Sequence, residues 1–105
     1  MKRLAQEREL YSGLIRLHIL HHAAQERIFG MGIMEELARH GYQLSPGTLY
    51  PMLHTLERKG HLRSKEERDG KRMRRVYRVT PLGRRVFRAA KAKVRELFEE
   101  IFDEK

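Results

Sequence analysis

The sequence predicts a mainly α-helical fold with a small β-hairpin, arranged as a winged helix-turn-helix plus a long C-terminal dimerisation helix. Apolar residues recur at helical spacing in four separate segments. One segment with strand-like alternation follows an Asp-Gly pair, which is a strong signal for a hairpin turn. The chain also carries a net charge of +9, as expected of a protein that binds a polyanion such as nucleic acid.

The length of 105 residues suits one compact unit. Within it we expect residues 1–80 to form the DNA-binding winged helix-turn-helix with its N-terminal helix, and residues 81–105 to form the dimerisation helix. The absence of cysteine excludes disulfides and thiolate metal sites. No apolar run approaches the roughly 20 residues that cross a bilayer. Charged residues follow the basic start where a signal peptide would be apolar, so we expect a cytoplasmic protein.

The first helix is predicted from Leu10 to about Arg27, with a broad apolar face. The segment Gly30-Met31-Gly32 is expected to break it. A second, shorter helix follows from Ile33, and Gly41 is expected to cap its C-terminal end.

The third helix is predicted to begin at Ser45, whose hydroxyl can accept a hydrogen bond from the first turn, with Pro46 at the first helical position. Its apolar residues should face the core: Leu49, Met52, Leu53 and Leu56. The remaining positions point elsewhere: Thr48, Tyr50, Pro51, His54, Thr55 and Arg58. The interior Pro51 removes one backbone hydrogen bond and is expected to bend the start of this helix. Two short helices with a polar outer face on the second are typical of a helix-turn-helix.

After Gly60 the pattern changes to that of a β-hairpin, with strands at 62–65 and 73–80 around a turn at 68–71. In the second strand Met73, Arg75, Tyr77 and Val79 share one face, and Arg72, Arg74, Val76 and Arg78 share the other. Tyr77 and Val79 should pack on the helices, and the arginines and the tip of the loop should project. Residues 58–88 hold 13 of the 23 lysines and arginines, so the positive charge is concentrated around this predicted wing.

The last helix is predicted from Pro81 to about Asp103, a length of about 35 Å, which exceeds what a small domain needs for its own core. Because its apolar stripe extends past the domain, we expect it to be covered by self-association. The predicted dimerisation residues are Leu14, Val86, Ala90, Val94, Leu97, Phe98 and Ile101.

The segments LSPGTLYPML at 44–53 and RRVYRVT at 74–80 resemble the PadR family of bacterial transcriptional regulators, in the short form with a single C-terminal helix. The resemblance covers most of the chain. It implies a homodimer that binds a pseudo-palindromic operator on double-stranded DNA and usually represses. It also implies a small aromatic or cationic effector that releases the DNA. The dimer is expected to form between the last helix and the partner's first helix, with a ligand pocket lined by Leu14, His18, Val94 and Phe98.

On this interpretation the third helix and the wing contact DNA. The start of the helix should lie against backbone and base edges through Ser45, Gly47, Thr48, Tyr50 and Pro51. One turn later His54 and Thr55 should reach bases, and Arg58 a phosphate. The wing contacts should be Lys71, Arg72, Arg74 and Arg75. For Tyr50 a place in the core or the dimer is the alternative.

Two other functions stay open at this point. A non-specific architectural DNA-binding protein would have the same charge. A metal-responsive regulator could use His18 and His22, four residues apart on one helix, with Glu26 continuing the row. The sequence shows no nucleophile motif and no glycine-rich phosphate loop, so it does not predict an enzyme. We assign it no cofactor and no metal ion.

Overall fold

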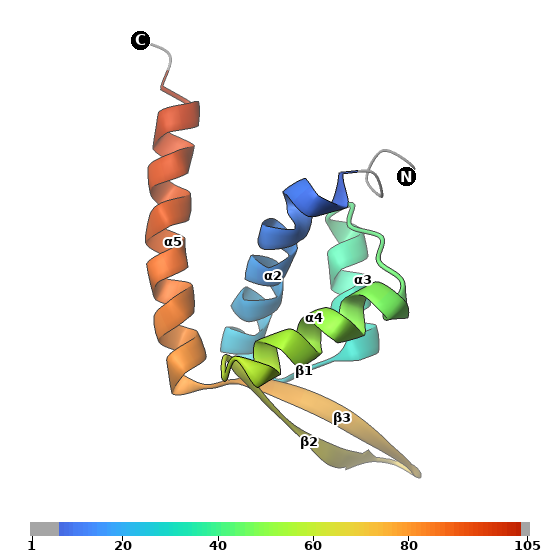
Figure 1. Ribbon diagram of the computed structural model, residues 1–105. Coiled ribbons are helices and arrows are strands. Elements are labelled where there is room, and N and C mark those ends of the chain that lie inside the picture. Colours follow the sequence, from blue (N-terminus) through green and yellow to red (C-terminus); the bar gives the residue numbers. More distant parts are fainter. Residues whose placement is uncertain (1–6, 104–105) are drawn as a thin grey trace.

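The computed structural model describes residues 7–103 and confirms the predicted fold class (Figure 1). The first six residues of the expected 1–80 unit and the last two of the expected 81–105 helix lie outside this range. The elements follow in the order α2 (Arg8–Gln25), β1 (Ile28–Phe29), α3 (Gly30–Arg39), α4 (Pro46–Arg58), β2 (Leu62–Asp69), β3 (Arg72–Val79) and α5 (Pro81–Ile101).

The core lies between α2, α3 and α4, and the base of the hairpin closes it. Ile19 of α2 and Leu37 of α3 are fully buried at its centre. Tyr77 of β3 is also buried and attaches the wing to the helices. The residues of α4 that were predicted to face the core are all buried: Leu49, Met52, Leu53 and Leu56. The helical periodicity of the sequence therefore predicted the orientation of α4 correctly.

The hairpin forms as predicted, with a longer first strand and a shorter turn. β2 and β3 pair antiparallel from Leu62 opposite Val79 to Asp69 opposite Arg72. Only Gly70 and Lys71 remain in the turn, and Gly70 has a φ of 65°. A positive φ at the first of two turn residues matches the right-handed twist of the strands, which is why glycine suits this position. β2 is longer than predicted because charged residues continue the ladder to the tip, and β3 keeps its predicted length but begins and ends one residue earlier.

The region between the first two helices differs from the prediction. Gly30-Met31-Gly32 is not a break, because α3 begins at Gly30 itself. The preceding residues Ile28 and Phe29 form a short strand that pairs with Tyr77 and Val76 of β3, so the sheet has the order β1-β3-β2. α2 ends at Gln25, two residues before the predicted end. A strand of two residues has no period of its own, so only its pairing with β3 defines it.

The ends of the short helices follow their sequence signals. Gly41 has a φ of 90° and the N–H of Tyr42 donates to the Leu37 carbonyl at 2.9 Å, which confirms the predicted glycine cap of α3. Pro46 stands at the first position of α4, and α4 runs unbroken through Pro51.

The junction of α4, the wing and α5 is held by Thr80 and fits only a glycine at position 83. The Thr80 hydroxyl donates to the Gly60 carbonyl at 2.5 Å and accepts from the Gly83 N–H at 2.9 Å. The Thr80 N–H donates to the carbonyl of His61 at 3.1 Å. A Cβ atom on Gly83 would lie 2.1 Å from that same His61 oxygen. The start of α5 therefore sits directly on the backbone that leads from α4 into β2.

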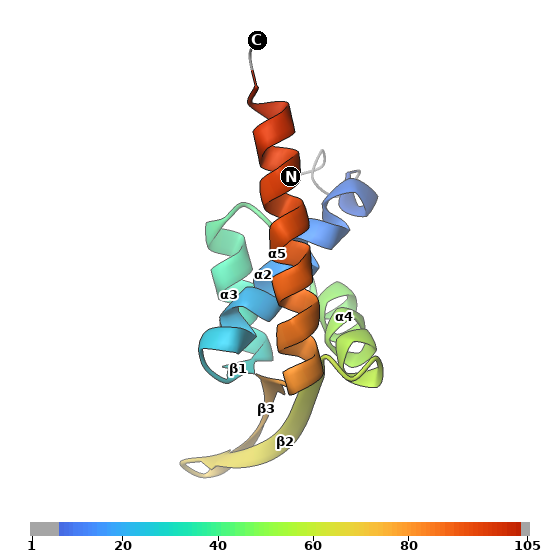
Figure 2. The ribbon, with the colours of Figure 1, turned by 90° about the vertical axis from the view of Figure 1, so that its left-hand side faces the viewer.

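α5 packs its first half along α2 and then extends beyond the rest of the domain (Figures 1 and 2). From Lys91 to the end of the described chain every residue is exposed. This exposed part carries five large apolar side chains: Val94, Leu97, Phe98, Ile101 and Phe102. A contiguous apolar stripe of this kind on a soluble surface is a signal for an interaction site.

We expect Gly83→Ala to destabilise the fold by about 1–3 kcal/mol, because the new methyl group would overlap a backbone oxygen that cannot move independently. Gly47→Ala is the matched control, since its Cβ would meet only the Ser45 hydroxyl at 3.7 Å. Urea unfolding followed by circular dichroism measures both. Equal stability of the two variants would show that α5 is not seated as described.

Candidate nucleic-acid interface

α4 has one buried face and one exposed face, and the exposed face carries most of the predicted contact residues. Thr48 and Thr55 lie half-buried on its borders. Four of the exposed positions are spaced by four, three and four residues: Gly47, Pro51, His54 and Arg58. This spacing places them in a single row along the helix. The row is free of acidic residues, so its electrostatic character is set by Arg58 and by the start of the helix.

The first turn of α4 leaves the Gly47 N–H available to a ligand, because Pro46 has no N–H and those of Thr48 and Leu49 donate to the Ser45 carbonyl at 3.0 Å. Ser45 has the extended backbone of an N-cap residue, but its hydroxyl donates to the Thr48 hydroxyl at 3.4 Å and makes no capping bond to the backbone. The predicted capping role of the Ser45 side chain is therefore wrong. Exposed N–H groups at the positive end of a helix are a suitable site for a phosphate.

Tyr50 is placed between α4 and the start of α3. Its ring packs against the core and is half-buried. A Cβ atom at Gly30 would lie 2.0 Å from the Tyr50 hydroxyl oxygen, so the side chain fills the space that glycine leaves. Tyr50 also borders a pocket shared with Met31, Met73 and Arg75, which connects it to the wing. The tyrosine thus positions α4 and still has an accessible edge beside the wing.

The wing contains its own acidic residues, and three arginines pair with them. Within β3, Arg74 lies 2.5 Å from Asp69, Arg75 3.5 Å from Glu66 and Arg78 2.8 Å from Glu67. The hydrogen bond from Arg78, with the charges of Arg27 and Lys65 nearby, lowers the pKa of the Glu67 carboxyl group. These three ion pairs compensate part of the positive charge of the wing within the protein itself.

Arg74 is the predicted wing contact that the structure places least favourably for DNA. Its guanidinium group stacks on the Phe29 ring at 4.0 Å and pairs with Asp69. Val76, on the same face, is buried, so part of this face is covered and Arg74 does not project freely as predicted. The reason is β1, which brings Phe29 opposite Val76. Sequence reasoning missed β1 and with it the partner of Arg74.

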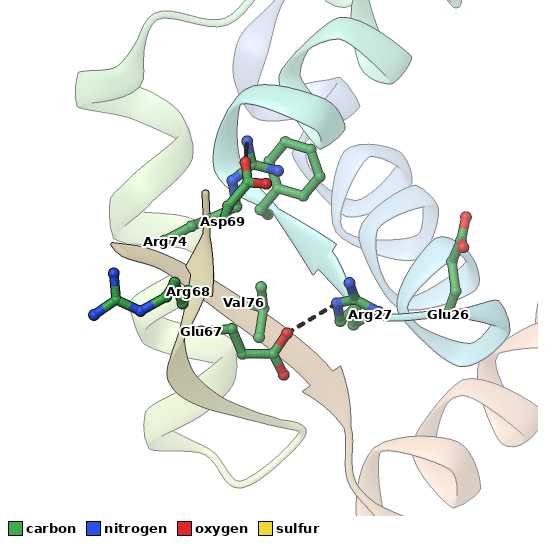
Figure 3. A pocket seen from close by; sticks show the side chains of 8 residues that line it. Glu26, Arg27, Glu67, Arg68, Asp69, Arg74 and Val76 are labelled. Atoms are coloured by element: carbon green, nitrogen blue, oxygen red, sulfur yellow. Dashed lines mark ion pairs between the residues drawn. The ribbon is translucent and has the colours of Figure 1, made fainter. Parts of the chain in front are cut away.

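This face of the sheet also forms a pocket lined by charged groups that already pair with one another. Figure 3 shows Arg27 and Glu67 facing each other across it, joined by an ion pair of 3.1 Å. Arg74 and Asp69 pair at its other side. Because its charges are compensated internally, the pocket is a poor site for an anion.

Six other cations near α4 and the wing are exposed and make no ion pair within residues 7–103. They run from the end of α4 to the wing tip: Arg58, Lys59, Arg63, Arg68, Lys71 and Arg72. Three of them, Arg58, Lys71 and Arg72, were predicted as contacts. Lys59, Arg63 and Arg68 were not, although the concentration of basic residues at 58–88 was the signal for them. These unpaired charges are the ones that a phosphate backbone can neutralise.

A hydrogen-bond network holds the wing in a fixed orientation to α4. The Ser64 hydroxyl donates to Glu57 Oε2 at 2.5 Å, and the Ser64 N–H donates to the same oxygen at 3.3 Å. Arg75 Nη1 then donates to the Ser64 hydroxyl at 3.0 Å. α4, β2 and β3 are joined through one serine, which sequence reasoning did not identify because its partners are 7 and 11 residues away.

The predicted dimerisation residues all lie on α2 or α5. Val86 and Ala90 are half-buried near α2, whereas Leu14, Val94, Leu97, Phe98 and Ile101 are exposed. A groove between the two helices is lined by Leu14, His18 and Val94 together with Tyr42 and Phe87. Three of the four residues predicted for a ligand pocket are thus brought together, and Phe98 lies outside this groove. None of the helices described is both long and apolar enough to cross a membrane.

The chain is similar to known transcriptional regulators. The family model of the "Transcriptional regulator PadR-like family" matches residues 19–89. Transcriptional regulator Rv3488 of Mycobacterium tuberculosis is 48% identical over 94 residues, which cover 90% of this chain and 88% of that protein. The crystal structure of a PadR family transcriptional regulator from Eggerthella lenta aligns with a TM-score of 0.77 at 32% identity, over 89% of this chain and 82% of the other. A PadR-like transcriptional regulator from Bacillus cereus shares the fold, with a TM-score of 0.75 at 20% identity over 92% and 99% of the two chains.

We expect Ser64→Ala to lower the free energy of unfolding by about 1–2 kcal/mol, because it leaves the Glu57 carboxylate and the Arg75 guanidinium without their shared partner. Ser45→Ala should cost less than about 0.5 kcal/mol, since its hydroxyl makes only one long, exposed contact. Chemical denaturation of both serine variants gives the comparison. A larger loss at Ser45 would contradict the described start of α4.

Proposed function

The chain belongs to the PadR-like family of DNA-binding transcriptional regulators, and we propose that it acts as a homodimeric repressor of a pseudo-palindromic operator. In this proposal α4 enters the major groove and the wing binds the flanking phosphates. One observation carries it: an exposed row on α4 that lacks acidic residues lies beside six unpaired cations. The wing is held to α4 by the Glu57–Ser64–Arg75 network, so both surfaces reach the DNA as one rigid unit.

The residues of α4 divide into two roles by position. The start of the helix, at Ser45 and Gly47, would approach a phosphate through backbone N–H groups, because glycine adds no side chain there. Thr48, Pro51, His54 and Thr55 would face base edges, and Arg58 would bind a phosphate at the end of the helix. Tyr50 would act mainly by positioning α4, with its accessible edge toward the DNA. Base contacts would set the preferred sequence, and phosphate contacts the affinity.

The wing would contribute mainly electrostatic binding. Lys71 and Arg72 stand at the tip, where they are exposed and unpaired within the described chain. Arg75 lies on the face toward α4 and would exchange its 3.5 Å contact with Glu66 for a phosphate. Arg74 would contribute least, because its guanidinium group stacks on Phe29. Of the four predicted wing contacts we therefore favour Lys71 and Arg72.

Dimerisation would cover the exposed stripe of α5. Phe98 and Ile101 are 59% and 62% exposed in the single chain, a large apolar area to leave in water. On α2, Leu10 and Leu14 are also exposed and offer a complementary surface for a partner's α5. A two-fold dimer would place two α4 helices in successive major grooves. Residues 81–105 would then serve as the dimerisation helix and residues 1–80 as the DNA-binding unit.

The groove between α2 and α5 is our candidate for the effector. Leu14, Val94 and Phe87 give it apolar walls, and His18 and Tyr42 give it polar atoms. These groups suit a small aromatic or cationic compound. Because α5 also forms the proposed dimer interface, a ligand there would change the spacing of the two α4 helices and release the operator in the cytoplasm.

In-vitro selection of duplex DNA by the purified chain at about 0.15 M salt tests operator recognition. We expect an enriched inverted repeat with half-sites about 10 base pairs apart. Thr55→Ala should relax the preference at one base position. Arg72→Ala should weaken binding to all sequences and reduce the salt slope by about 1. No enriched sequence, with binding that disappears as salt rises, would replace the proposal with a non-specific architectural protein.

We expect Leu97→Glu to convert the dimer into a monomer, because it places a charge within the apolar stripe of α5. Ala92→Glu introduces the same side chain on the opposite face of α5 and should leave the dimer intact. Size-exclusion chromatography with light scattering distinguishes the chain mass of 12.5 kDa from twice that value. A wild-type monomer at micromolar concentration would contradict the proposed assembly.

A further inference from the structure

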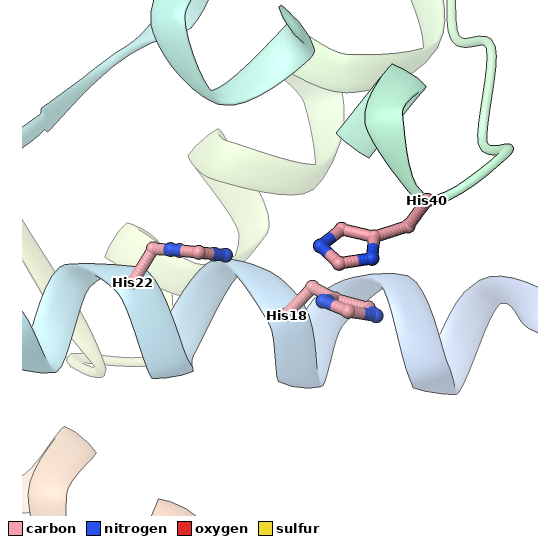
Figure 4. Close-up of side chains that lie close together, drawn as sticks. All are labelled: His18, His22 and His40. Carbon is pink, nitrogen blue, oxygen red and sulfur yellow. The ribbon is translucent and has the colours of Figure 1, made fainter. Parts of the chain in front are cut away.

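Three histidines from two helices come together on the side of α2 that faces α3. His18 and His22 lie one turn apart on α2, and His40 follows the end of α3 (Figure 4). Their ring nitrogens include one from each residue that all lie within 4.8 Å of one another. The His40 ring centroid is 4.6 Å from that of His18, and the His18 and His22 rings are nearly parallel at 6.4 Å. The third imidazole was not foreseeable from the sequence, because only tertiary packing brings α3 to α2.

A carboxylate from α3 lies against the same rings. Glu36 Oε2 is 3.7 Å from His22 Nε2 and 3.3 Å from His40 Nε2, while the other oxygen of Glu36 pairs with Arg39. Glu26, which the sequence placed in the row with His18 and His22, makes no such contact with them. The acidic partner of the histidines therefore comes from α3 and not from α2.

The imidazole groups are in the state that metal binding needs. Burial lowers the pKa of His18, and the neighbouring His40, His22 and His21 lower it further. Burial also lowers the pKa of His22, against the opposing effect of Glu36. Both shifts favour the neutral imidazole of His18 and His22, which has the lone pair that a metal ion binds. Partial exposure of all three leaves a path for an ion from solvent.

We propose that His18, His22, His40 and Glu36 form a binding site for a divalent transition-metal ion, with zinc as the best match. Three imidazole nitrogens and one carboxylate oxygen are a suitable tetrahedral donor set for zinc, and the absence of cysteine disfavours softer ions. Zinc–nitrogen bonds of about 2.0–2.1 Å require neighbouring donor atoms about 3.4 Å apart. The nitrogen atoms, which lie within 4.8 Å of one another, therefore need to approach by at most about 1.4 Å, which rotation of the half-exposed His40 side chain allows.

The ion would strengthen a connection between α2 and α3 that otherwise consists of packing and the contact between His22 and Glu36. His18 lines the groove between α2 and α5. His40 begins the six-residue connector, residues 40–45, that leads into α4. Metal binding would fasten the end of α3 to α2 at this point and stabilise the helix-turn-helix. The site itself does not depend on the proposed operator binding, so it is tested without DNA.

The test uses the untagged full-length chain after dialysis against a chelator, with cobalt as a spectroscopic probe and zinc as competitor. We expect one cobalt ion per chain, with the intense visible absorption of a tetrahedral complex, and its displacement by zinc. Zinc should also raise the melting temperature of the wild-type chain, because it binds the folded state only. Weak absorption typical of hexahydrated cobalt, with no change in melting temperature, would overturn the proposal.

Substitutions identify the ligands. His40→Gln should abolish the tetrahedral spectrum, and Glu36→Gln should weaken binding by about 10- to 100-fold. His21→Gln is the matched control, because this residue lies on α2 beside the site but outside the cluster, and it should bind cobalt like the wild type. Melting curves without metal show whether each variant is folded. Unchanged binding in folded His40→Gln would reduce the site to the two histidines of α2 and refute it.

Discussion

The structure depends on the junction where α4 ends, β2 begins, β3 ends and α5 starts. Four backbone segments meet there within a few residues of Thr80, whose hydroxyl bonds both to Gly60 and to Gly83. Gly83 rests on the carbonyl of His61 at a distance that leaves no room for a side chain. Because α4 and α5 leave this junction in different directions, its geometry sets how the exposed row of α4 is oriented relative to the apolar stripe of α5.

The uncompensated positive charge is concentrated at the wing tip and at the end of α4. The acids of the wing, such as Glu67 and Asp69, pair with arginines on the face near β1. This leaves the wing tip and the end of α4 with unpaired cations. Lys71 and Arg72 at the tip therefore keep a field that a duplex can neutralise, while the base of the wing is stabilised by its own pairs. Two factors therefore define the proposed DNA-binding surface: the positions of the basic residues in the sequence, and which of those residues are already paired with acidic residues of the wing.

Features that depend on neighbouring residues were predictable from the sequence. The apolar period of α4 identified its buried face, Gly41 marked the end of α3, and the Asp69-Gly70 pair marked the wing turn. The apolar stripe of α5 that the structure leaves exposed followed from its period and length. The prediction for the Ser45 side chain was wrong. Ser45 occupies the N-cap position as predicted, but its hydroxyl donates to the Thr48 hydroxyl and accepts no bond from a backbone N–H. The residue type alone does not determine which of these two neighbouring groups a serine hydroxyl contacts.

The sequence by itself thus determined the helices, the hairpin and the exposed row of α4, because each arises from interactions within a few residues along the chain. Tertiary structure alone decided three other features. It paired Ile28 and Phe29 with β3, which turned Arg74 away from the proposed DNA surface. It joined the wing to α4 through Ser64. It also brought His40 to the histidines of α2. These contacts join residues distant in sequence, and their energy comes from packing and pairing that no local pattern encodes.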